Sequence, residues 1–431
     1  MTRWSARLAL AALAPLSVLA AAEFAARARP DSAPTDSELA LLWVAGTRPA
    51  FDCDPSGNCR TNPELVRLSN PDERFRAAPA PGTFRVVCVG DSTTAGWPYQ
   101  PRGGYPERLA QVLRAALAPR RVEVLNLGVH AWDGARLETV FGQALAFHPD
   151  AVLVRVGYDD YPHFLLRHPR GGAVGRIAQS ARLFLLSRSA AFRLLSRGLG
   201  PAPRQGIVAS PLIRLTADEE DLLVADHRRR LERLARRAAS ARAPLIVLGL
   251  PYWAGFAPRY PGLSALSRQK KETAGAAKAL GLPFVALDDL PESEFLDLMH
   301  ADDRGEARVA RDAARALEAA GLPVGARWRW SRVPTDAAIA RALRLDEADY
   351  RAHLEARLAA FFASHGLMAR AQAHMEAALR AAPNPDLVPL ELRSGGDAAT
   401  REVYRAALER LRRSGRDFSP RQAEDRAFAG L

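Results

Sequence analysis

The stretch Phe84-Arg85-Val86-Val87-Cys88-Val89-Gly90-Asp91-Ser92-Thr93 decides the fold. Its mostly apolar first part is typical of a buried strand, and Gly90 then supplies a turn residue. We expect Ser92 to lie where this strand gives way to a helix, with its hydroxyl exposed by the turn. A serine hydroxyl is a weak nucleophile near neutral pH and needs an adjacent imidazole to take its proton.

The motif Asp297-Leu298-Met299-His300 can supply that imidazole. A carboxylate three residues before a histidine can reach its ring within one turn and hold the ring in the tautomer that accepts a proton. The free ring nitrogen of His300 would then face a serine from a distant part of the chain. We therefore predict that Ser92, His300 and Asp297 act as nucleophile, base and orienting group.

Apolar patterns elsewhere predict an alternation of strands and helices. The predicted strands span residues 84–89, 122–127, 151–156, 245–250 and 284–287, and the predicted helices span residues 105–118, 134–147, 216–241, 263–280 and 305–320. Such alternation predicts a parallel sheet with helices on both faces. Reacting groups gather at the carboxyl ends of the strands in these sheets, and Ser92, Gly128, Asp159 and Asp160 all follow a predicted strand.

These motifs resemble the signature blocks of the SGNH (GDSL-type) hydrolases, in the family's order, over roughly Phe84 to Leu322. The first block is Gly90-Asp91-Ser92-Thr93, the second contains Gly128, and the last is Asp297 with His300. The resemblance implies a three-layer α/β/α sandwich around a parallel five-stranded sheet, as in flavodoxin-like folds. It also implies hydrolysis of carboxylic esters or transfer of an acyl group.

The third block departs from the family pattern. Where the family has Gly-x-Asn-Asp, this chain has Gly157-Tyr158-Asp159-Asp160. The resemblance implies an oxyanion hole formed by the amides of Ser92 and Gly128 and by the side chain at position 159. An ionised aspartate donates no hydrogen bond and repels an oxyanion. Three alternatives follow: Asp159 is held protonated near Asp160, the third donor is absent and the enzyme is slow, or catalysis has been lost.

Length and composition limit the remaining possibilities. A chain of 431 residues exceeds the usual size of one domain, so accessory segments are expected beside a catalytic domain. The formal net charge is +12, and nearly all the positive charge is arginine scattered without stacked aromatic residues. This pattern argues against nucleic-acid binding. No four Cys or His residues have zinc-site spacing, and we expect neither a metal site nor a cofactor.

The first 27 residues are predicted to be a signal peptide or a membrane anchor. Arg3 and Arg7 precede fifteen uncharged residues, Leu8 to Ala22, which is short for a membrane span. A cleaved secretory signal and an uncleaved inner-membrane anchor both fit this run. Either one places the remainder in the periplasm or elsewhere outside the cytoplasm. Cys53 and Cys59 enclose a short turn-prone loop that a disulfide can close in such a compartment, with two free cysteines as the alternative.

The chain is divided by these patterns into four regions. After the signal or anchor, residues 28–82 are predicted to be a linker, and residues 83–322 the SGNH hydrolase domain. Residues 161–211 interrupt that domain as a helical insertion, with a helix predicted over 177–199. Its alternating apolar and arginine residues fit either a basic amphipathic lid or membrane-surface helix, or an ordinary helix packed on the sheet.

The last region, residues 323–431, is predicted to be a helical tail. Residues 352–384 resemble one tetratricopeptide repeat, although Glu355 replaces its opening tryptophan. About three repeats are needed for an independent array, so either a peptide-binding groove or a hairpin docked on the catalytic domain or on a protein partner is expected. Residues 403–411 predict one further helix.

Together these patterns predict an exported SGNH-type serine esterase. Its expected substrate is a small ester or an acylated glycan, and O-acetyl esters of envelope glycans suit the compartment by resemblance alone. An O-acyltransferase acting on envelope glycans, or a non-catalytic scaffold that keeps the fold, is the alternative. A membrane partner is expected only through an uncleaved N-terminal segment.

Overall fold

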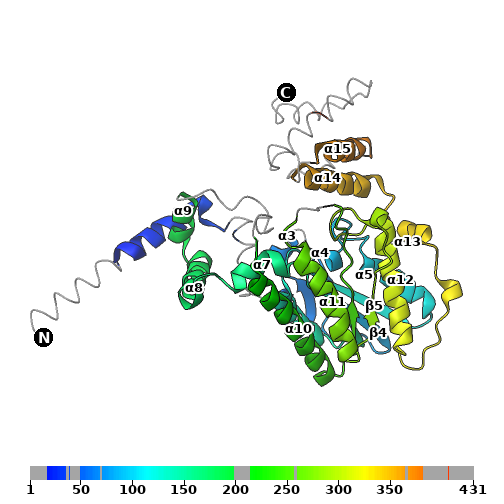
Figure 1. Ribbon diagram of the computed structural model, residues 1–431. Coiled ribbons are helices and arrows are strands. Elements are labelled where there is room, and N and C mark those ends of the chain that lie inside the picture. Colours follow the sequence, from blue (N-terminus) through cyan, green and yellow to red (C-terminus); the bar gives the residue numbers. More distant parts are fainter. Residues whose placement is uncertain are drawn as a thin grey trace, which may run out of the picture.

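A parallel five-stranded sheet in the order β5-β4-β6-β7-β8 forms the centre of the protein (Figure 1). A computed structural model of the chain describes residues 17–34, 38, 49–67, 70–198, 214–256, 260–364, 367–381 and 406. The central strands are β4 (Thr83–Gly90), β5 (Arg121–Gly128), β6 (Ala151–Arg155), β7 (Leu245–Leu248) and β8 (Phe284–Val285). All neighbouring strands are parallel, which confirms the predicted sheet.

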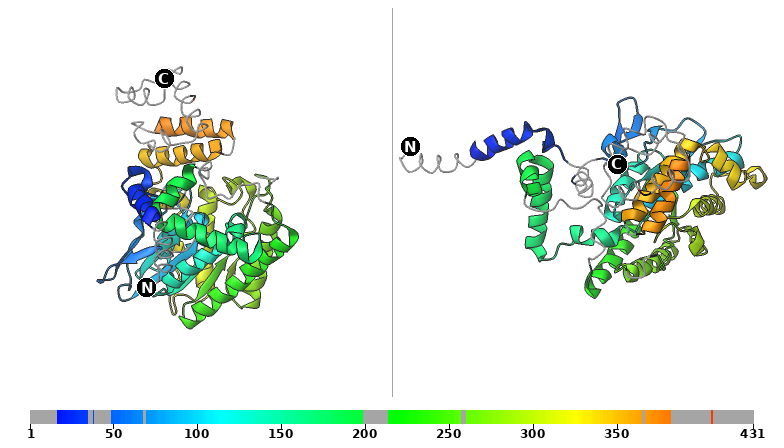
Figure 2. Two further views of the ribbon diagram at one scale, coloured as in Figure 1. Left: turned by 90° about the vertical axis from the view of Figure 1, so that its left-hand side faces the viewer. Right: turned by 90° about the horizontal axis from the view of Figure 1, so that it is seen from above.

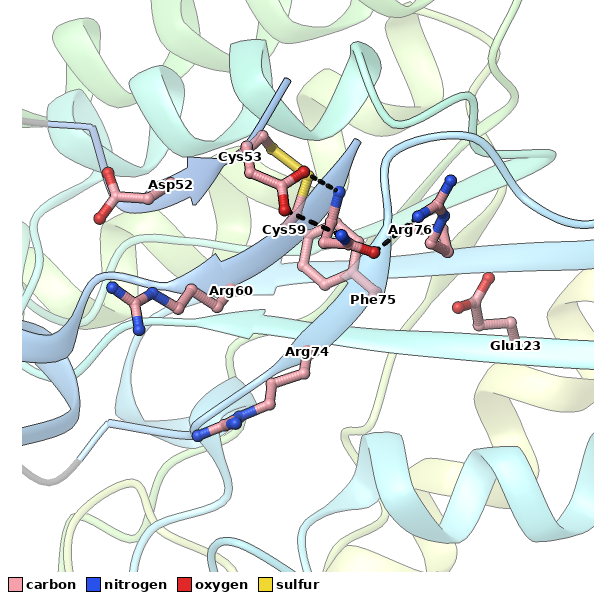
Figure 3. A pocket seen from close by; sticks show the side chains of 10 residues that line it. Asp52, Cys53, Cys59, Arg60, Arg74, Phe75, Arg76 and Glu123 are labelled. Atoms are coloured by element: carbon pink, nitrogen blue, oxygen red, sulfur yellow. Dashed lines mark hydrogen bonds between the residues drawn. A yellow bond between two sulfur atoms is a disulfide. The ribbon is translucent and has the colours of Figure 1, made fainter. Parts of the chain in front are cut away.

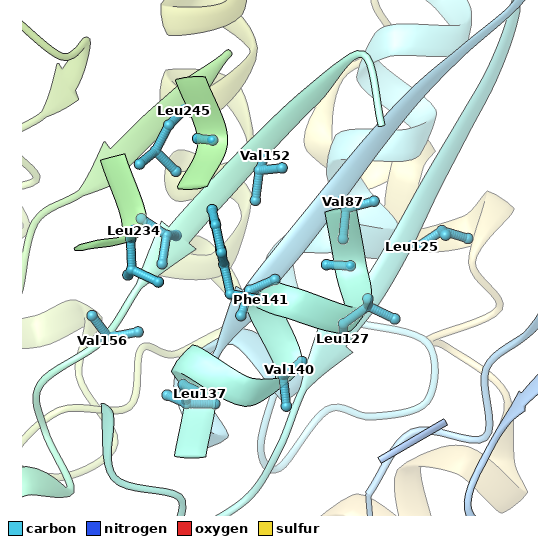
Figure 4. Close-up of a cluster of buried hydrophobic side chains, with 14 of the residues drawn as sticks. Val87, Leu125, Leu127, Leu137, Val140, Phe141, Val152, Val156, Leu234 and Leu245 are labelled. Atoms are coloured by element: carbon cyan, nitrogen blue, oxygen red, sulfur yellow. The ribbon is translucent and has the colours of Figure 1, made fainter. Parts of the chain in front are cut away.

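Helices cover both faces of this sheet because its strands are apolar on both sides. Along β4, Val87 and Val89 face one apolar core while Val86 and Cys88 face the other. The first core lies under α6 (Gly134–Leu145), α10 (Ala217–Ser240) and α11 (Leu263–Ala279) (Figure 4). The second lies under α5 (Tyr105–Ala116) and α12 (Asp303–Ala319). The predicted three-layer α/β/α fold is therefore confirmed.

Helix α10 begins at the capping box that its sequence predicts. The Thr216 hydroxyl accepts the amide of Glu219, and the Glu219 carboxylate accepts the amide of Thr216 at 2.8 Å. These reciprocal bonds satisfy two amides that a helix leaves free at its start. The cap fixes where the chain re-enters the sandwich after the insertion.

Residues 28–82, which were predicted to be a linker, include regular secondary structure. Residues 51–76 form a three-stranded antiparallel sheet of β1 (Phe51–Cys53), β2 (Asn58–Thr61) and β3 (Arg74–Arg76), with α3 (Pro63–Arg67) between β2 and β3. Phe51 and Phe75 pack edge-on against Phe147 after α6. The region therefore belongs to the catalytic domain. A short 3₁₀ helix, η1 (Pro30–Ser32), precedes it.

A disulfide joins Cys53 and Cys59 across the hairpin of β1 and β2, as predicted. Figure 3 shows it beside an open hollow of about 860 Å³ on the outer side of this small sheet. Arginines and acidic residues line the hollow together: Asp52, Asp54, Arg60, Arg74, Arg76 and Glu123. None of the predicted catalytic residues borders it.

The insertion after β6 begins with α7 (Asp160–Arg167) and continues as α8 (Gly172–Arg188) and α9 (Ala190–Gly198). The single helix predicted over 177–199 is thus two helices, because the chain turns at Ser189, whose backbone is extended. Figure 2 shows α8, α9 and the N-terminal helix, described over residues 17–27, reaching away from the sandwich. No helix within the described ranges is long and apolar enough to span a membrane. Residues 1–16 of the predicted signal or anchor lie outside these ranges.

The C-terminal region forms α13 (Asp336–Ala342) and then a hairpin of α14 (Ala348–Ser364) and α15 (Met368–Ala381). Five positions of the predicted repeat pack in the apolar core of this hairpin: Leu358, Phe362, Ala371, Met375 and Ala378. A helical hairpin is therefore present, but a tetratricopeptide repeat is not confirmed. Of the further helix predicted over 403–411, only residue 406 is described. Two more 3₁₀ helices are η2 (Glu292–Glu294) and η3 (Trp330–Arg332).

Candidate active site

Ser92 is the first residue of α4 (Ser92–Ala95) and stands at the carboxyl end of β4. The turn requires glycine at position 90, since a Cβ there would lie 2.1 Å from Thr94 Oγ1 and 2.5 Å from the Arg155 carbonyl oxygen. The Asp91 carboxylate then caps α4 by accepting the Thr93 amide at 3.0 Å. Together the glycine and the cap present the Ser92 hydroxyl beyond the sheet edge, as the motif predicts.

The structure brings Ser92, His300 and Asp297 together in one hydrogen-bonded chain. Ser92 Oγ lies 2.7 Å from His300 Nε2, and His300 Nδ1 lies 2.6 Å from Asp297 Oδ2. The other Asp297 oxygen accepts the backbone amides of Met299 and His300, at 2.8 Å and 2.7 Å. The carboxylate therefore has no freedom to turn away, and it directs the Nε2 atom of His300 at the serine.

Asp297 remains ionised in spite of its burial. Burial alone raises the pKa of a carboxyl group, but the charge of His300 and its hydrogen bonds outweigh it and hold the pKa of Asp297 below its usual range. An ionised Asp297 can stabilise a positive charge on His300. This is the charge that forms when the imidazole takes the proton of a serine.

The amide of Gly128, predicted to be an oxyanion donor, already has an acceptor within its own strand. Its amide donates to the Asn126 side-chain oxygen at 3.1 Å, so this N–H is already engaged. A Cβ at Gly128 would lie 2.1 Å from the Ala95 amide nitrogen. The glycine therefore allows α4 to pack closely against β5, which is a structural role.

The loop after β5 offers a different amide. Past Gly128, the amide of Val129 donates to the Gly90 carbonyl oxygen at 2.8 Å, and that of His130 to Asn70 Oδ1 at 2.7 Å. Within the described part of the chain, the next amide, that of Ala131, has no hydrogen-bond acceptor. Ala131 also has φ of 56°, which non-glycine residues rarely adopt. Strain of this kind often accompanies a functional loop.

His130 is a neutral imidazole near His300. Burial, together with the positive charges of His300 and Arg357, lowers the pKa of His130 to about 3. Its Nε2 atom lies 3.2 Å from Gln100 Nε2, and its backbone is held by Asn70 of the segment once predicted as a linker. The small N-terminal sheet therefore helps to fix the loop that borders the serine.

Asp159 follows β6, the strand that pairs with β4, and precedes α7. Its Oδ2 atom is buried and has no hydrogen-bond partner within the described residues. Burial and the like charge of Asp91 raise the pKa of Asp159 well above its usual range, and the pKa of Asp91 is raised by burial as well. A negative charge on one of two neighbouring buried carboxyl groups makes the other hold its proton more strongly.

Asp160 has a structural role instead. Its two oxygens accept the Gly134 amide at 2.7 Å, the Arg230 guanidinium at 2.7 Å and the Gln269 amide group at 3.0 Å. These bonds tie α6, α10 and α11 to the start of α7. Although burial opposes ionisation, the charge of Arg230 and the hydrogen bond from His227 hold the pKa of Asp160 well below its usual range. The pKa values of the neighbouring Asp159 and Asp160 are therefore shifted in opposite directions.

The C-terminal hairpin is connected to His300 through two aromatic rings. The Trp97 ring lies 4.6 Å from the His300 ring, and the Phe361 ring of α14 lies 4.7 Å from Trp97, centroid to centroid. The Tyr350 hydroxyl donates to the Tyr99 carbonyl oxygen at 2.6 Å, which holds α14 on the loop after α4. Ser92 is 9% exposed and the His300 side chain 12%. Both side chains are therefore largely screened from solvent.

Sequence reasoning missed Trp97, His130, Ala131 and Phe361. The rule that reactive groups follow strand ends can find His130 and Ala131, because both come directly after β5. No local pattern points to Phe361, which lies far along the chain from Ser92 in a separate helical hairpin. No group of three or more His, Cys, Asp or Glu residues in the described ranges is placed to hold a metal ion.

A Ser–His–Asp group at the strand ends of a parallel α/β sandwich defines a class of ester-hydrolysing enzymes. The chain belongs to the GDSL-like lipase/acylhydrolase family, whose sequence model matches residues 88–312. The protein is therefore an enzyme that acts on ester bonds. The matched region runs from β4 through most of α12 and leaves the hairpin of α14 and α15 outside it.

Solved structures of such enzymes align with this chain at low identity. A lipase/acylhydrolase from Enterococcus faecalis is 18% identical, with 55% of this chain and 96% of that chain covered and a TM-score of 0.37. An α/β hydrolase from the Lake Arreo metagenome is 16% identical, with 54% and 94% covered and a TM-score of 0.36. An acetylxylan esterase from Geobacillus stearothermophilus is 14% identical, with 54% and 93% covered and a TM-score of 0.35. None of the curated proteins matches significantly.

Proposed function

We propose that the protein is an exported serine esterase that uses Ser92, His300 and Asp297 to hydrolyse small carboxylic esters. The observation that carries the proposal is the continuous hydrogen-bonded chain from Ser92 Oγ through His300 to Asp297. Ser92 Oγ attacks the ester carbonyl carbon while its proton moves to His300 Nε2. The tetrahedral intermediate then expels the alcohol, which takes that proton. Water repeats the sequence on the acyl-serine and releases the acid.

The scheme assigns three donors to the oxyanion of the tetrahedral intermediate. We assign the first two to the amides of Ser92 and Ala131, neither of which has an acceptor within the described residues. The third is the protonated carboxyl group of Asp159, whose raised pKa lets it donate as an asparagine would. Each such donor is commonly worth ~3 kcal/mol in the transition state. Asp159 therefore takes the role of the family's asparagine, but only at pH values where its carboxyl group is protonated.

The aromatic rings beside His300 favour small acyl groups such as acetyl. The Trp97 ring packs against His300, and the Phe361 ring packs against Trp97. O-acetyl esters on glycans fit a site that accepts a small acyl group and leaves the alcohol part toward solvent. The triad does not discriminate between water and a sugar hydroxyl as the acceptor of the acyl group. Acyl transfer to a glycan is therefore the alternative to hydrolysis.

The decisive experiment is labelling of the purified full-length protein by a serine-reactive fluorophosphonate, with Ser92→Ala as the control. We expect one label per chain on Ser92 in the wild type and none in the variant. The same preparation should cleave 4-nitrophenyl acetate. Added sugar alcohols that raise the release of nitrophenol, and become acetylated, would assign acyl transfer instead. A wild type that neither labels nor cleaves would support a non-catalytic scaffold.

Phe361→Ala should widen the acyl preference of the enzyme. Removing this ring opens space beside Trp97, so we expect the kcat/KM ratio of octanoyl to acetyl ester to rise about tenfold. Met368→Ala is a matched control, since it shortens an apolar side chain of α15 outside the aromatic stack. An unchanged ratio in Phe361→Ala, with wild-type fluorophosphonate labelling, would show that the hairpin does not limit acyl length.

Export is a separate part of the proposal. Its support is the disulfide of Cys53 and Cys59 together with the uncharged run behind Arg3 and Arg7. Disulfides persist mainly in oxidising compartments, which indicates a periplasmic or other extracytoplasmic location. The N-terminal segment is either cleaved or retained as an inner-membrane anchor, and the mass of the N-terminal peptide distinguishes the two.

Protein taken from its native envelope should resist alkylation at Cys53 and Cys59 until it is reduced. Mass spectrometry of the peptide after alkylation without reduction measures this directly, and the N-terminal peptide in the same sample shows whether cleavage has occurred. Full alkylation of both cysteines would contradict the disulfide. A reporter fused after residue 60 that is active only in the cytoplasm would contradict export.

For the C-terminal region, the tetratricopeptide-like pattern of residues 352–384 suggests a protein partner. The described hairpin instead packs its apolar core beside Trp97, Phe256 and Leu296 of the catalytic domain. We therefore propose docking on the catalytic domain as its main role. A groove for a peptide would need further helices from the residues beyond 381.

A further inference from the structure

Helix α8 carries an apolar face that no described part of the chain covers. Of its 17 residues only Leu186 is buried. Val174 is 76% exposed, Ile177 70% and Phe184 64%. Leu185 is also exposed. Side chains spaced by three, four and seven residues lie on one side of a helix, so these four form a stripe roughly 120° wide. We call it the α8 face.

The α8 face is the outer side of a helix that already has an inner apolar side. Leu183 and Leu186 lie on the opposite part of the helix and are half-buried and buried. The inner side accounts for the packing of the insertion, and the outer side has no such use. Monomeric proteins seldom leave a continuous stripe of large apolar side chains in water. An external partner would account for a face that no described residue covers.

The N-terminal helix is fixed against this insertion and adds to its exposed apolar surface. The Glu23 carboxylate accepts the Ser189 hydroxyl at 2.7 Å and the Ala190 amide at 3.0 Å, at the start of α9. Arg193 Nε donates to the Ser32 carbonyl oxygen at 2.9 Å. In the same helix Val18 is 68% exposed and Phe24 80%. Val18 belongs to the uncharged run that starts at Leu8, so the chain beside α8 is itself compatible with lipid.

The charge of the insertion identifies the kind of partner. Residues 161–198 contain seven arginines and no aspartate or glutamate. Four of these arginines bond to groups of the protein itself: Arg167, Arg170, Arg193 and Arg197. The exposed Arg176, Arg182 and Arg188 have no acidic partner within the described residues. A second copy would bring like charges together, whereas anionic lipid head groups would neutralise them.

We infer that the α8 face lies in the surface of an anionic bilayer, with Val174, Ile177 and Phe184 among the acyl chains and Arg182 and Arg188 at the head groups. A helix with apolar residues on one side and arginines beside them binds in this orientation without crossing the membrane. The long arginine stems can lie along apolar surface while their charges stay at the head groups. This contact is distinct from any anchor formed by the N-terminal residues, and it would orient the catalytic domain toward the membrane surface.

The test attaches an environment-sensitive fluorophore to Ile177→Cys in the full-length protein. Labelling is selective because Cys53 and Cys59 are joined and Cys88 is buried. Vesicles contain phosphatidylcholine with about one third phosphatidylglycerol, and brominated acyl chains report contact with the apolar layer. We expect at least about twofold quenching at position 177. A fluorophore on Leu280→Cys, an exposed residue after α11, should not be quenched.

Two comparisons separate this inference from its alternatives. Arg182→Gln combined with Arg188→Gln should reduce the quenching at position 177 in anionic vesicles, and high salt should do the same. Vesicle-bound protein without quenching at position 177 would overturn the inference, because it would leave the N-terminal segment as the membrane contact. A spectral shift without vesicles, accompanied by dimerisation in sedimentation, would overturn it in favour of a second copy. Activity on a soluble acetyl ester should be unchanged in the double arginine variant.

Discussion

Replacing Ser92 by alanine should lower kcat/KM for a short aryl ester by about 10⁴-fold or more, because the variant has no nucleophile to form the acyl-enzyme. His300→Ala should have an effect of similar size, since the Ser92 hydroxyl then keeps its proton. The double variant should be no slower than either single one, because nucleophile and base act as one unit. Initial rates with 4-nitrophenyl acetate, at saturating and at low substrate concentration, give kcat/KM for the two single variants and the double variant.

The control for this series is Ser240→Ala, which removes an exposed serine hydroxyl at the end of α10, and it should keep the wild-type rate. Circular dichroism and thermal unfolding establish that each variant is folded. If the wild type is no faster than Ser92→Ala on any ester from acetyl to octanoyl, the protein is a scaffold that keeps the fold. A large loss in His300→Ala with no loss in Ser92→Ala would point to a different nucleophile.

The α/β/α sandwich could be predicted from the sequence because the pattern that predicts each strand or helix lies within the element itself. The strands β4 to β7 are four to eight residues long and mostly apolar, and the covering helices have an apolar side at helical spacing. The site followed from one further rule, since parallel strands bring their carboxyl ends to a common edge. Ser92 and His300, separated by 208 positions, meet there at 2.7 Å. The sequence motifs therefore needed only the topology to bring them together.

The small N-terminal sheet was missed because its strands are only three or four residues long and are separated by Pro, Asp and Asn. Such composition is typical of a loop, and here the disulfide and the contacts of Phe51 and Phe75 with Phe147 supply the stability. The role of Gly128 is hard to predict from the sequence for a related reason. A glycine after a strand can serve close packing or anion binding, and only the position of the Ala95 backbone separates the two.

The contact between the hairpin and the site could not be predicted at all from local patterns. The periodicity of residues 352–384 predicts that two helices pair, but not which surface they dock on. That surface depends on complementary shapes far apart in sequence, such as Trp97 between His300 and Phe361. The same holds for the protonation of Asp159, because a pKa depends on burial and on charges that only the folded chain brings near.

Asp159→Asn should abolish the alkaline decline in activity that we expect for the wild type. Burial and the charge of Asp91 hold the pKa of Asp159 well above its usual range, so the carboxyl group keeps its proton and donates a hydrogen bond up to that pKa. As the pH rises through it, the wild type loses a donor and gains a negative charge beside the oxyanion. Asparagine donates at every pH. The variant should therefore match the wild type within about threefold on the acid side and be about tenfold faster or more above the titration.

The variant Asp91→Asn tests whether the charge of Asp91 helps to raise the pKa of Asp159. It preserves the cap of α4, since an asparagine oxygen can still accept the Thr93 amide, but it removes the like charge that helps to raise the pKa of Asp159. Asp159 should then lose its proton at lower pH, so the alkaline decline of kcat/KM should begin at lower pH than in the wild type. In Asp159→Asn, by contrast, this decline should be absent. Profiles of kcat/KM against pH for the two variants, with folding checked at each pH, measure this. An Asp159→Asn variant that is slower than the wild type at all pH values would show that the carboxylate itself has a role, and that the oxyanion assignment does not hold at this position.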